Sequence, residues 1–70
     1  MRKTFYEVFK INPDNSLEPL RRVKIGGVEF GPGVKFSGGV RFGGIDFTKY
    51  IGRDLEIEVE GDLWVITGIY

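Results

Sequence analysis

The last sixteen residues of the chain carry the pattern that most narrows the possible folds. Residues 55–60 alternate aliphatic side chains with glutamates, Gly61-Asp62 suits a two-residue turn, and residues 63–70 continue as a run of strand-forming side chains. This combination predicts a β-hairpin, and a two-residue turn sets its register. The pairs predicted on one apolar face are Val59 with Trp64, Ile57 with Ile66, and Leu55 with Gly68.

The opposite face of the same hairpin is also partly apolar. The predicted register places Glu60 beside Leu63, Glu58 beside Val65 and Glu56 beside Thr67, with Ile69 beyond. A strand that is apolar on both faces must be covered on both. Either the N-terminal strand covers this side, or it binds a protein partner. In the second case the binding surface consists of Leu63, Val65 and Ile69 with a rim of Glu56, Glu58 and Glu60.

Composition extends the strand prediction to the rest of the chain. Alanine and glutamine are absent, whereas the chain has seven Val, seven Ile, three Thr and ten aromatic residues, all of which favour strands. Eleven glycines and three prolines divide the chain into short segments. We therefore expect one all-β domain over residues 1–70: a small barrel, SH3-like or OB-like, or a compact β-sandwich of short antiparallel strands.

An internal repeat occupies the middle of the chain. The motif aliphatic-x-Phe recurs at intervals of six, six and five residues, with glycine-rich links between the copies. Because six is even, an extended backbone directs these aliphatic and Phe side chains to one face and the charged residues between them to the other. The copies, all expected in the core, are Val28-Glu-Phe30, Val34-Lys-Phe36, Val40-Arg-Phe42 and Ile45-Asp-Phe47, with a bend at Gly43-Gly44.

Four further local patterns complete the predicted secondary structure. Thr48 and Gly52 have the residue types of a helix N-cap and of a left-handed residue after a helix, so one short helical turn is expected near 48–52. The others are a strand at 3–11, a turn at 12–16 rich in Asn, Asp and Pro, and a strand at 20–25 that Gly26-Gly27 ends.

The charges balance over the whole chain but not along it. Ten basic and ten acidic residues give no net charge. Residues 1–53 hold all the basic residues and a balance of +5, whereas residues 54–70 have a balance of −5. Either the two parts neutralise each other within one fold, or they attract other copies of the chain.

The absence of histidine and cysteine removes most catalytic and metal chemistry. Among the carboxylates, three glutamates that alternate with aliphatic residues are typical of a solvated strand face rather than of a catalytic pair. We therefore expect a protein that is not an enzyme, with no catalytic residue, no cofactor and no metal. Its expected function is protein-protein association, chiefly homo-oligomerisation.

Single-stranded nucleic-acid binding is the alternative function. Small barrels bind single strands through aromatic stacking beside a basic groove. The repeat argues against this use, because it places Phe36 on the core face, opposite Lys35. The candidate residues are Arg22, Lys24, Lys35 and Arg41, with Arg21 beside them.

The sequence also favours a cytoplasmic location without a membrane anchor. No apolar run reaches the roughly 18–20 residues that span a bilayer, and residues 1–7 lack the apolar stretch of a signal peptide. A chain without cysteine fits a reducing compartment.

Overall fold

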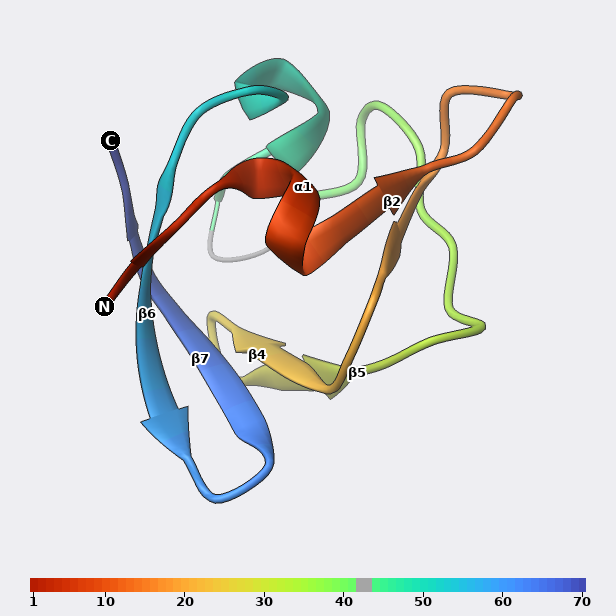
Figure 1. Cartoon of the computed structure of the whole chain (residues 1–70). Helices are drawn as coiled ribbons and strands as arrows, with labels where there is room; N and C mark the ends of the chain where they lie inside the picture. The colour runs from red at the N-terminus through yellow and green to blue at the C-terminus, as the bar shows by residue number, and fades with distance from the viewer. Residues whose placement is uncertain (42–43) are drawn as a thin grey trace.

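The computed structural model describes residues 1–41 and 44–70, which form two β-sheets (Figure 1). A five-stranded sheet has the order β1-β6-β7-β4-β5, and a two-stranded sheet pairs β2 with β3. The all-β prediction is confirmed. The elements are β1 (Arg2–Lys3), α1 (Phe5–Val8), β2 (Phe9–Ile11), β3 (Leu17–Pro19), β4 (Val23–Ile25), β5 (Val28–Phe30), the 3₁₀ helix η1 (Phe47–Tyr50), β6 (Leu55–Glu60) and β7 (Leu63–Ile69).

The five-stranded sheet is mixed rather than wholly antiparallel. β4 pairs with β7 in parallel, with Val23 opposite Trp64 and Lys24 opposite Val65. The two strands are joined by a long connection that contains β5 and β6, so their relative direction is not imposed by a tight turn. Among the described residues β1 and β5 are the edges of this sheet, which is therefore open rather than closed into a barrel.

The hairpin β6–β7 confirms the predicted register only near its turn. Val59 lies opposite Trp64 and Ile57 opposite Ile66, as the two-residue turn predicts. Beyond that point the register shifts, and Glu56 lies opposite Gly68 instead of Thr67. Thr67 is the extra residue of a β-bulge. Because one inserted residue reverses the faces of everything after it, Leu55 pairs with Ile69 rather than with Gly68.

The predicted strand at 3–11 is wrong in its middle, where the chain forms the single-turn helix α1. Thr4 and Glu7 have capping-box spacing, and the Thr4 amide donates to Glu7 Oε2 at 2.7 Å. Phe5, Val8 and Phe9 have the i, i+3, i+4 spacing of one helical face, and all three are buried. The local hydrogen bonds and this burial favour a helical turn over strand alternation.

The turn at 12–16 is confirmed, and it joins β2 to β3. The Asn12 amide donates to the Ser16 carbonyl at 2.8 Å, and the Asp14 carboxylate accepts from the Ser16 amide at 3.0 Å. The strand predicted at 20–25 begins only at Val23, and β3 was not expected. Leu17 in β3 is buried and exchanges two backbone hydrogen bonds with Phe36.

The repeat does not form one extended ribbon. Phe36 and Phe47 are buried, as expected, but Val28 and Val34 are each 48% exposed and Val40 is 40% exposed. Parity along a strand holds only while the backbone stays extended, and Gly33 and Gly39 adopt φ values of +96° and +92°. Phe42 and Gly43 lie outside the described residues, whereas Gly44, the second residue of the predicted bend, is in a turn with φ +82°.

The helical turn near 48–52 is confirmed as η1, which begins one residue earlier than expected. Its N-cap is Asp46 rather than Thr48, and the Asp46 carboxylate accepts from the Thr48 amide at 3.0 Å. Gly52 follows the helix with φ +89°, the left-handed conformation predicted for it.

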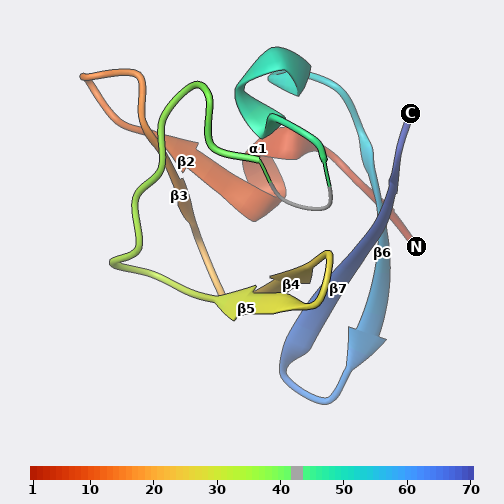
Figure 2. The ribbon, with the colours of Figure 1, turned by 180° about the vertical axis from the view of Figure 1, so that it is seen from behind.

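An aromatic core lies between the hairpin and the smaller sheet. α1, β2 and β3 lie on one side of β6–β7 in both views (Figures 1 and 2). Phe9 is central to this core: its ring centroid lies 5.1 Å from that of Phe5 and 5.8 Å from those of Phe36 and Phe47. Segments distant in sequence are thus held together by one side chain.

Replacement of Phe9 by alanine is expected to remove most of the folding stability. Truncation of a buried Phe costs about 3–5 kcal/mol, against a total of about 3.5–10 kcal/mol for a chain of this length. Val34→Ala, at an exposed copy of the repeat, is the control and is expected to cost under about 0.5 kcal/mol. Urea unfolding followed by circular dichroism measures both. Equal costs for the two variants would contradict this description of the core.

Candidate functional site

The side of the five-stranded sheet turned away from the core is the main candidate for a functional surface. Residues paired across a sheet point to the same side, and Val65 is paired with Glu58 in β6 and with Lys24 in β4. Leu63 is paired with Glu60 in the same way. Arg22, just before β4, contacts this side through Glu29, the partner of Lys24. Glu29 of β5 also lies on this side, at its edge beside Lys24. We call the outer face the six residues of β6, β7 and β4, with the residue before β4, that lie between this edge and β1: Arg22, Lys24, Glu58, Glu60, Leu63 and Val65.

The sequence-predicted surface is only partly reproduced here. Leu63 and Val65 lie on the outer face and are half-buried. Ile69 does not join them: because of the bulge at Thr67 it lies on the inner face, packed against the core. The N-terminal residues do not cover Leu63 and Val65 as a full strand, since β1 is two residues long and pairs with β6 near Glu56.

Some charged residues of the outer face form ion pairs within the chain and others do not. Arg22 Nη1 lies 3.2 Å from Asp62 Oδ1, and Arg22 Nη2 lies 3.0 Å from Glu29 Oε1. Within residues 1–41 and 44–70, no ion pair involves Lys24, Glu58 or Glu60. These three charges are therefore available to a partner.

Glu56, the remaining predicted rim residue, is engaged within the chain. The N-terminal ammonium of Met1 lies 2.7 Å from Glu56 Oε2, and the Tyr70 hydroxyl donates to Glu56 Oε1. The hydrogen bond from the ammonium group, followed by that from Tyr70, lowers the pKa of Glu56. The same bond to Glu56 raises the pKa of Tyr70. Arg2 completes the group, with its guanidinium carbon 4.0 Å from the centroid of the Tyr70 ring.

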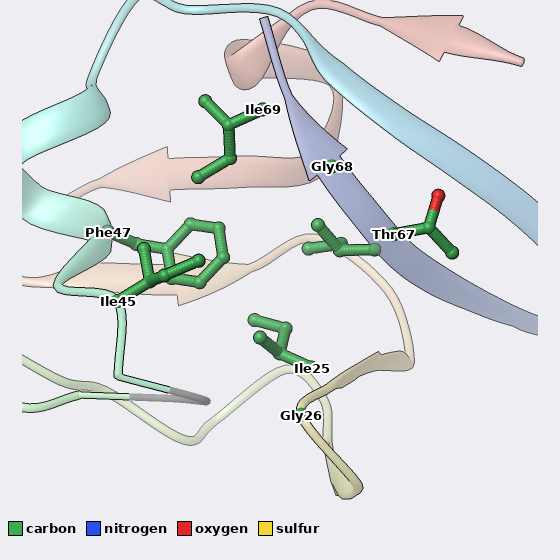
Figure 3. Close-up of a pocket in the computed structure, with 8 residues that line it drawn as sticks. Ile25, Gly26, Ile45, Phe47, Thr67, Gly68 and Ile69 are labelled. Carbon is green, nitrogen blue, oxygen red and sulfur yellow. The ribbon is translucent and has the colours of Figure 1, made fainter.

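A small apolar pocket opens on the inner side of the sheet, between β7, the β4–β5 turn and η1 (Figure 3). Its volume is about 160 Å³, below the roughly 300–1,000 Å³ of pockets that hold drug-sized ligands. It has room for a group the size of one side chain. Its lining consists of Ile25, Gly26, Ile45, Phe47, Ile66, Thr67, Gly68 and Ile69, which offer no acid or base.

Asp46 holds two of these lining residues in place. Its carboxylate accepts from the Thr48 hydroxyl and amide through Oδ1 and from the Gly39 amide, at 3.0 Å, through Oδ2. Ile45 and Phe47 flank it in sequence, so these bonds fix the pocket wall on both sides. The Thr48 hydroxyl, followed by the Gly39 amide, lowers the pKa of Asp46 because both stabilise the charged carboxylate.

A second cluster lies near the hairpin turn, on the inner side. The guanidinium carbon of Arg21 lies 4.0 Å from the centroid of the Trp64 ring, and Lys3 Nζ lies 5.4 Å from it. Val59, opposite Trp64, is 45% exposed. Sequence reasoning placed Trp64 on the apolar face but did not foresee the two cations, which only the tertiary fold brings to it.

The basic residues predicted for nucleic-acid binding are divided between two parts of the molecule. Arg22 and Lys24 lie on the outer face, and Arg22 is already paired with carboxylates. Lys35 and Arg41 lie in the segment between β5 and η1. Arg21 lies over the ring of Trp64, which is partly buried on the inner side of the sheet.

In residues 1–41 and 44–70, no three carboxylate, histidine or cysteine groups lie close enough to hold a metal ion. The same part of the chain has no helix long and apolar enough to cross a membrane. Comparison with known protein families, with curated proteins and with solved structures found no match to this chain.

Asp46→Asn is expected to destabilise the fold at neutral pH. A carboxyl with a lowered pKa stabilises the folded state above its unfolded pKa, and this contribution disappears as the pH falls through the folded pKa. Wild type is therefore expected to melt above the variant at pH 7, with the gap narrowing in acid below the ordinary range of an aspartate. Thermal unfolding over a pH series measures this. A gap that is the same at every pH would contradict a role for the ionised carboxylate.

Proposed function

We propose that this chain is a non-catalytic β domain of the cytoplasm that works by protein-protein association, in the first place with copies of itself. The observation that carries the proposal is the outer face, where Leu63 and Val65 stand between charged groups. Lys24, Glu58 and Glu60 in this face lack an ion-pair partner among the described residues. Interfaces commonly have an apolar centre with a polar rim, and complementary charges in them add specificity more than affinity.

Burial of these apolar side chains supplies the driving force in this proposal. Leu63 and Val65 are half-buried in the single chain, so a partner that covers them removes further apolar area from water, at about 25 cal/mol per Å². The face spans only three strands, β6, β7 and β4. We therefore expect an interface near the lower limit of stable ones, at about 1,200 Å² in total, and a dimer that dissociates on dilution.

Val65→Glu tests this interface directly. Wild type is expected to approach twice the 7.9 kDa of one chain as its concentration rises, whereas the variant stays at the mass of one chain. A glutamate here places a charge at the centre of the interface and beside Glu58. Light scattering gives the mass, and circular dichroism shows whether the fold is kept. Val34→Glu, on an exposed loop, is the matched control and is expected to associate as wild type does.

The proposal is overturned by either of two results. One is a wild type that remains at the mass of one chain at every concentration. The other is a folded Val65→Glu variant that associates as strongly as wild type.

The cluster around Trp64 supports a second candidate function, binding of single-stranded nucleic acid. Arg21 and Lys3 beside an indole provide the combination of cations and an aromatic ring that such sites use. Neither cation forms an ion pair with a carboxylate in the described part of the chain. The cluster lies on the inner side of the sheet, so this candidate does not depend on the outer face.

Trp64 reports on this site, because it is the only tryptophan in the chain. Titration with oligodeoxythymidine is expected to quench its fluorescence at low salt, with affinity falling as salt is added. Arg21→Ala is expected to weaken binding and to reduce the salt slope by about 1, whereas Lys49→Ala, at an exposed position in η1, leaves both unchanged. Absence of quenching at low salt would reject this candidate.

A further inference from the structure

On the outer face each of three neighbouring strands contributes side chains of one chemical type. β6 contributes the acidic residues Glu58 and Glu60, β7 contributes Leu63 and Val65, and β4 with the residue before it contributes Lys24 and Arg22. Acidic, apolar and basic side chains thus form three adjacent columns, and Glu29 of β5 lies beyond the basic one, beside Lys24. One row is Glu58, Val65, Lys24, whose pairings are direct. The other is Glu60, Leu63, Arg22, where the Arg22 carbonyl accepts from the amide of Trp64, next to Leu63.

Two copies of the outer face are complementary in charge for one orientation of a two-fold axis between them. Two identical sheets that pack face to face, about 10 Å apart, form an isologous pair when a two-fold axis lies between them. If the axis runs parallel to β7, the apolar column meets its own copy, and the acidic column of each chain lies over the basic column of the other. If the axis instead runs across the strands, Glu58 and Glu60 lie over the acidic column of the partner, which like charges disfavour.

We infer that the chain forms a two-fold dimer by sheet-to-sheet packing, with the axis along β7 and reciprocal pairing of Glu58 with Lys24 of a second copy. This inference rests on the proposed function and specifies its partner and geometry. Val65 and Leu63 meet their own copies at the centre, and Glu60 lies opposite Arg22 at the end nearer the hairpin turn. Arg22 keeps its contacts to Glu29 and Asp62, so Lys24 and Glu58 are the pair that is free to form across the interface.

Within one chain Lys24 has Glu29 as its cross-strand neighbour but forms no ion pair among the described residues, and Glu58 lies beside Val65 on β7 rather than beside a basic residue. Glu58 and Lys24 are separated by the whole width of β7, about two strand spacings or roughly 9.6 Å between backbones. Both side chains rise from the same face, with Val65 between them. A facing copy of the chain brings each of these groups opposite a charge of the other sign without any rearrangement of the backbone.

Charge reversal in two separate variants tests the arrangement. In Lys24→Glu both charged residues of the row Glu58, Val65, Lys24 are acidic, and in Glu58→Lys both are basic. Two copies of the same variant therefore repel each other in the proposed dimer. Each is expected to lose roughly tenfold or more in its self-association constant, since every substitution acts twice across the axis. An equimolar mixture of the two variants is expected to recover association as a heterodimer, because every facing pair is again of opposite sign.

The recovery in the mixture distinguishes contacts between chains from contacts within one chain. Lys35→Glu, at an exposed lysine away from the outer face, is the matched control. It is expected to associate with itself as wild type does and to give no recovery beyond its own level when mixed with Glu58→Lys. Sedimentation equilibrium measures each constant, and circular dichroism establishes that each variant is folded.

The outcomes separate this geometry from the proposed function. If wild type associates and Val65→Glu does not, but the mixture of Lys24→Glu with Glu58→Lys stays at the mass of one chain, the two-fold arrangement is wrong and the interface stands. Single variants that associate as strongly as wild type overturn the arrangement as well. If wild type does not associate at all, both the interface and its geometry are rejected.

Discussion

The extra residue at Thr67 is the constraint on which the arrangement of both sheet faces depends. One residue inserted in β7 reverses the side of every residue after it. Ile69 therefore turns inward and completes the core near Leu55, where a regular hairpin would expose it. The same inversion limits the apolar part of the outer face to Leu63 and Val65, and it turns Tyr70 outward to donate to Glu56. In a regular hairpin Ile69 would extend the apolar side chains of this face beyond Thr67; with the bulge they form a small patch, which suits reversible association better than permanent assembly.

Features that depend on neighbouring residues were predictable from the sequence, and features that depend on long-range pairing were not. The register beside the turn, the helical turn at η1 and the turn at 12–16 follow from local turn and capping chemistry. α1 was also within reach, because Thr4 and Glu7 have capping-box spacing, but alternation of apolar residues concealed it. The bulge has one local mark in Gly68, because a glycine inside a strand often indicates a bulge, but the regular register predicted from the turn did not take it into account. The repeat misled because its parity holds only over an extended backbone, which Gly33 and Gly39 interrupt.

In the candidate site, too, the residues grouped by local sequence were predictable and those grouped by long-range pairing were not. Glu58, Glu60, Leu63 and Val65 were placed correctly on one face, because a hairpin register suffices to group them. The sequence also places the basic residues before residue 54 and five acidic residues after it. In the sheet, Arg22 and Lys24 accordingly lie at β4, and Glu58 and Glu60 lie on β6. Their position on either side of β7 requires the parallel pairing of β4 with β7, which joins segments far apart in the chain. No periodicity within either segment specifies that pairing, so the three columns were beyond sequence reasoning.

The strength of the interactions made by the charges of the outer face depends on how far water surrounds them. Within one chain the backbones of Glu58 and Lys24 are about two strand spacings apart, roughly 9.6 Å, and solvent and salt weaken any attraction between the two side chains. In a sheet-to-sheet interface water is partly excluded and the same charges approach a partner of opposite sign, where each interaction is several times stronger. Desolvation offsets much of that gain in affinity. The pairs therefore act chiefly on orientation: they favour the one two-fold rotation in which unlike charges meet, while Leu63 and Val65 supply the burial that holds the two sheets together.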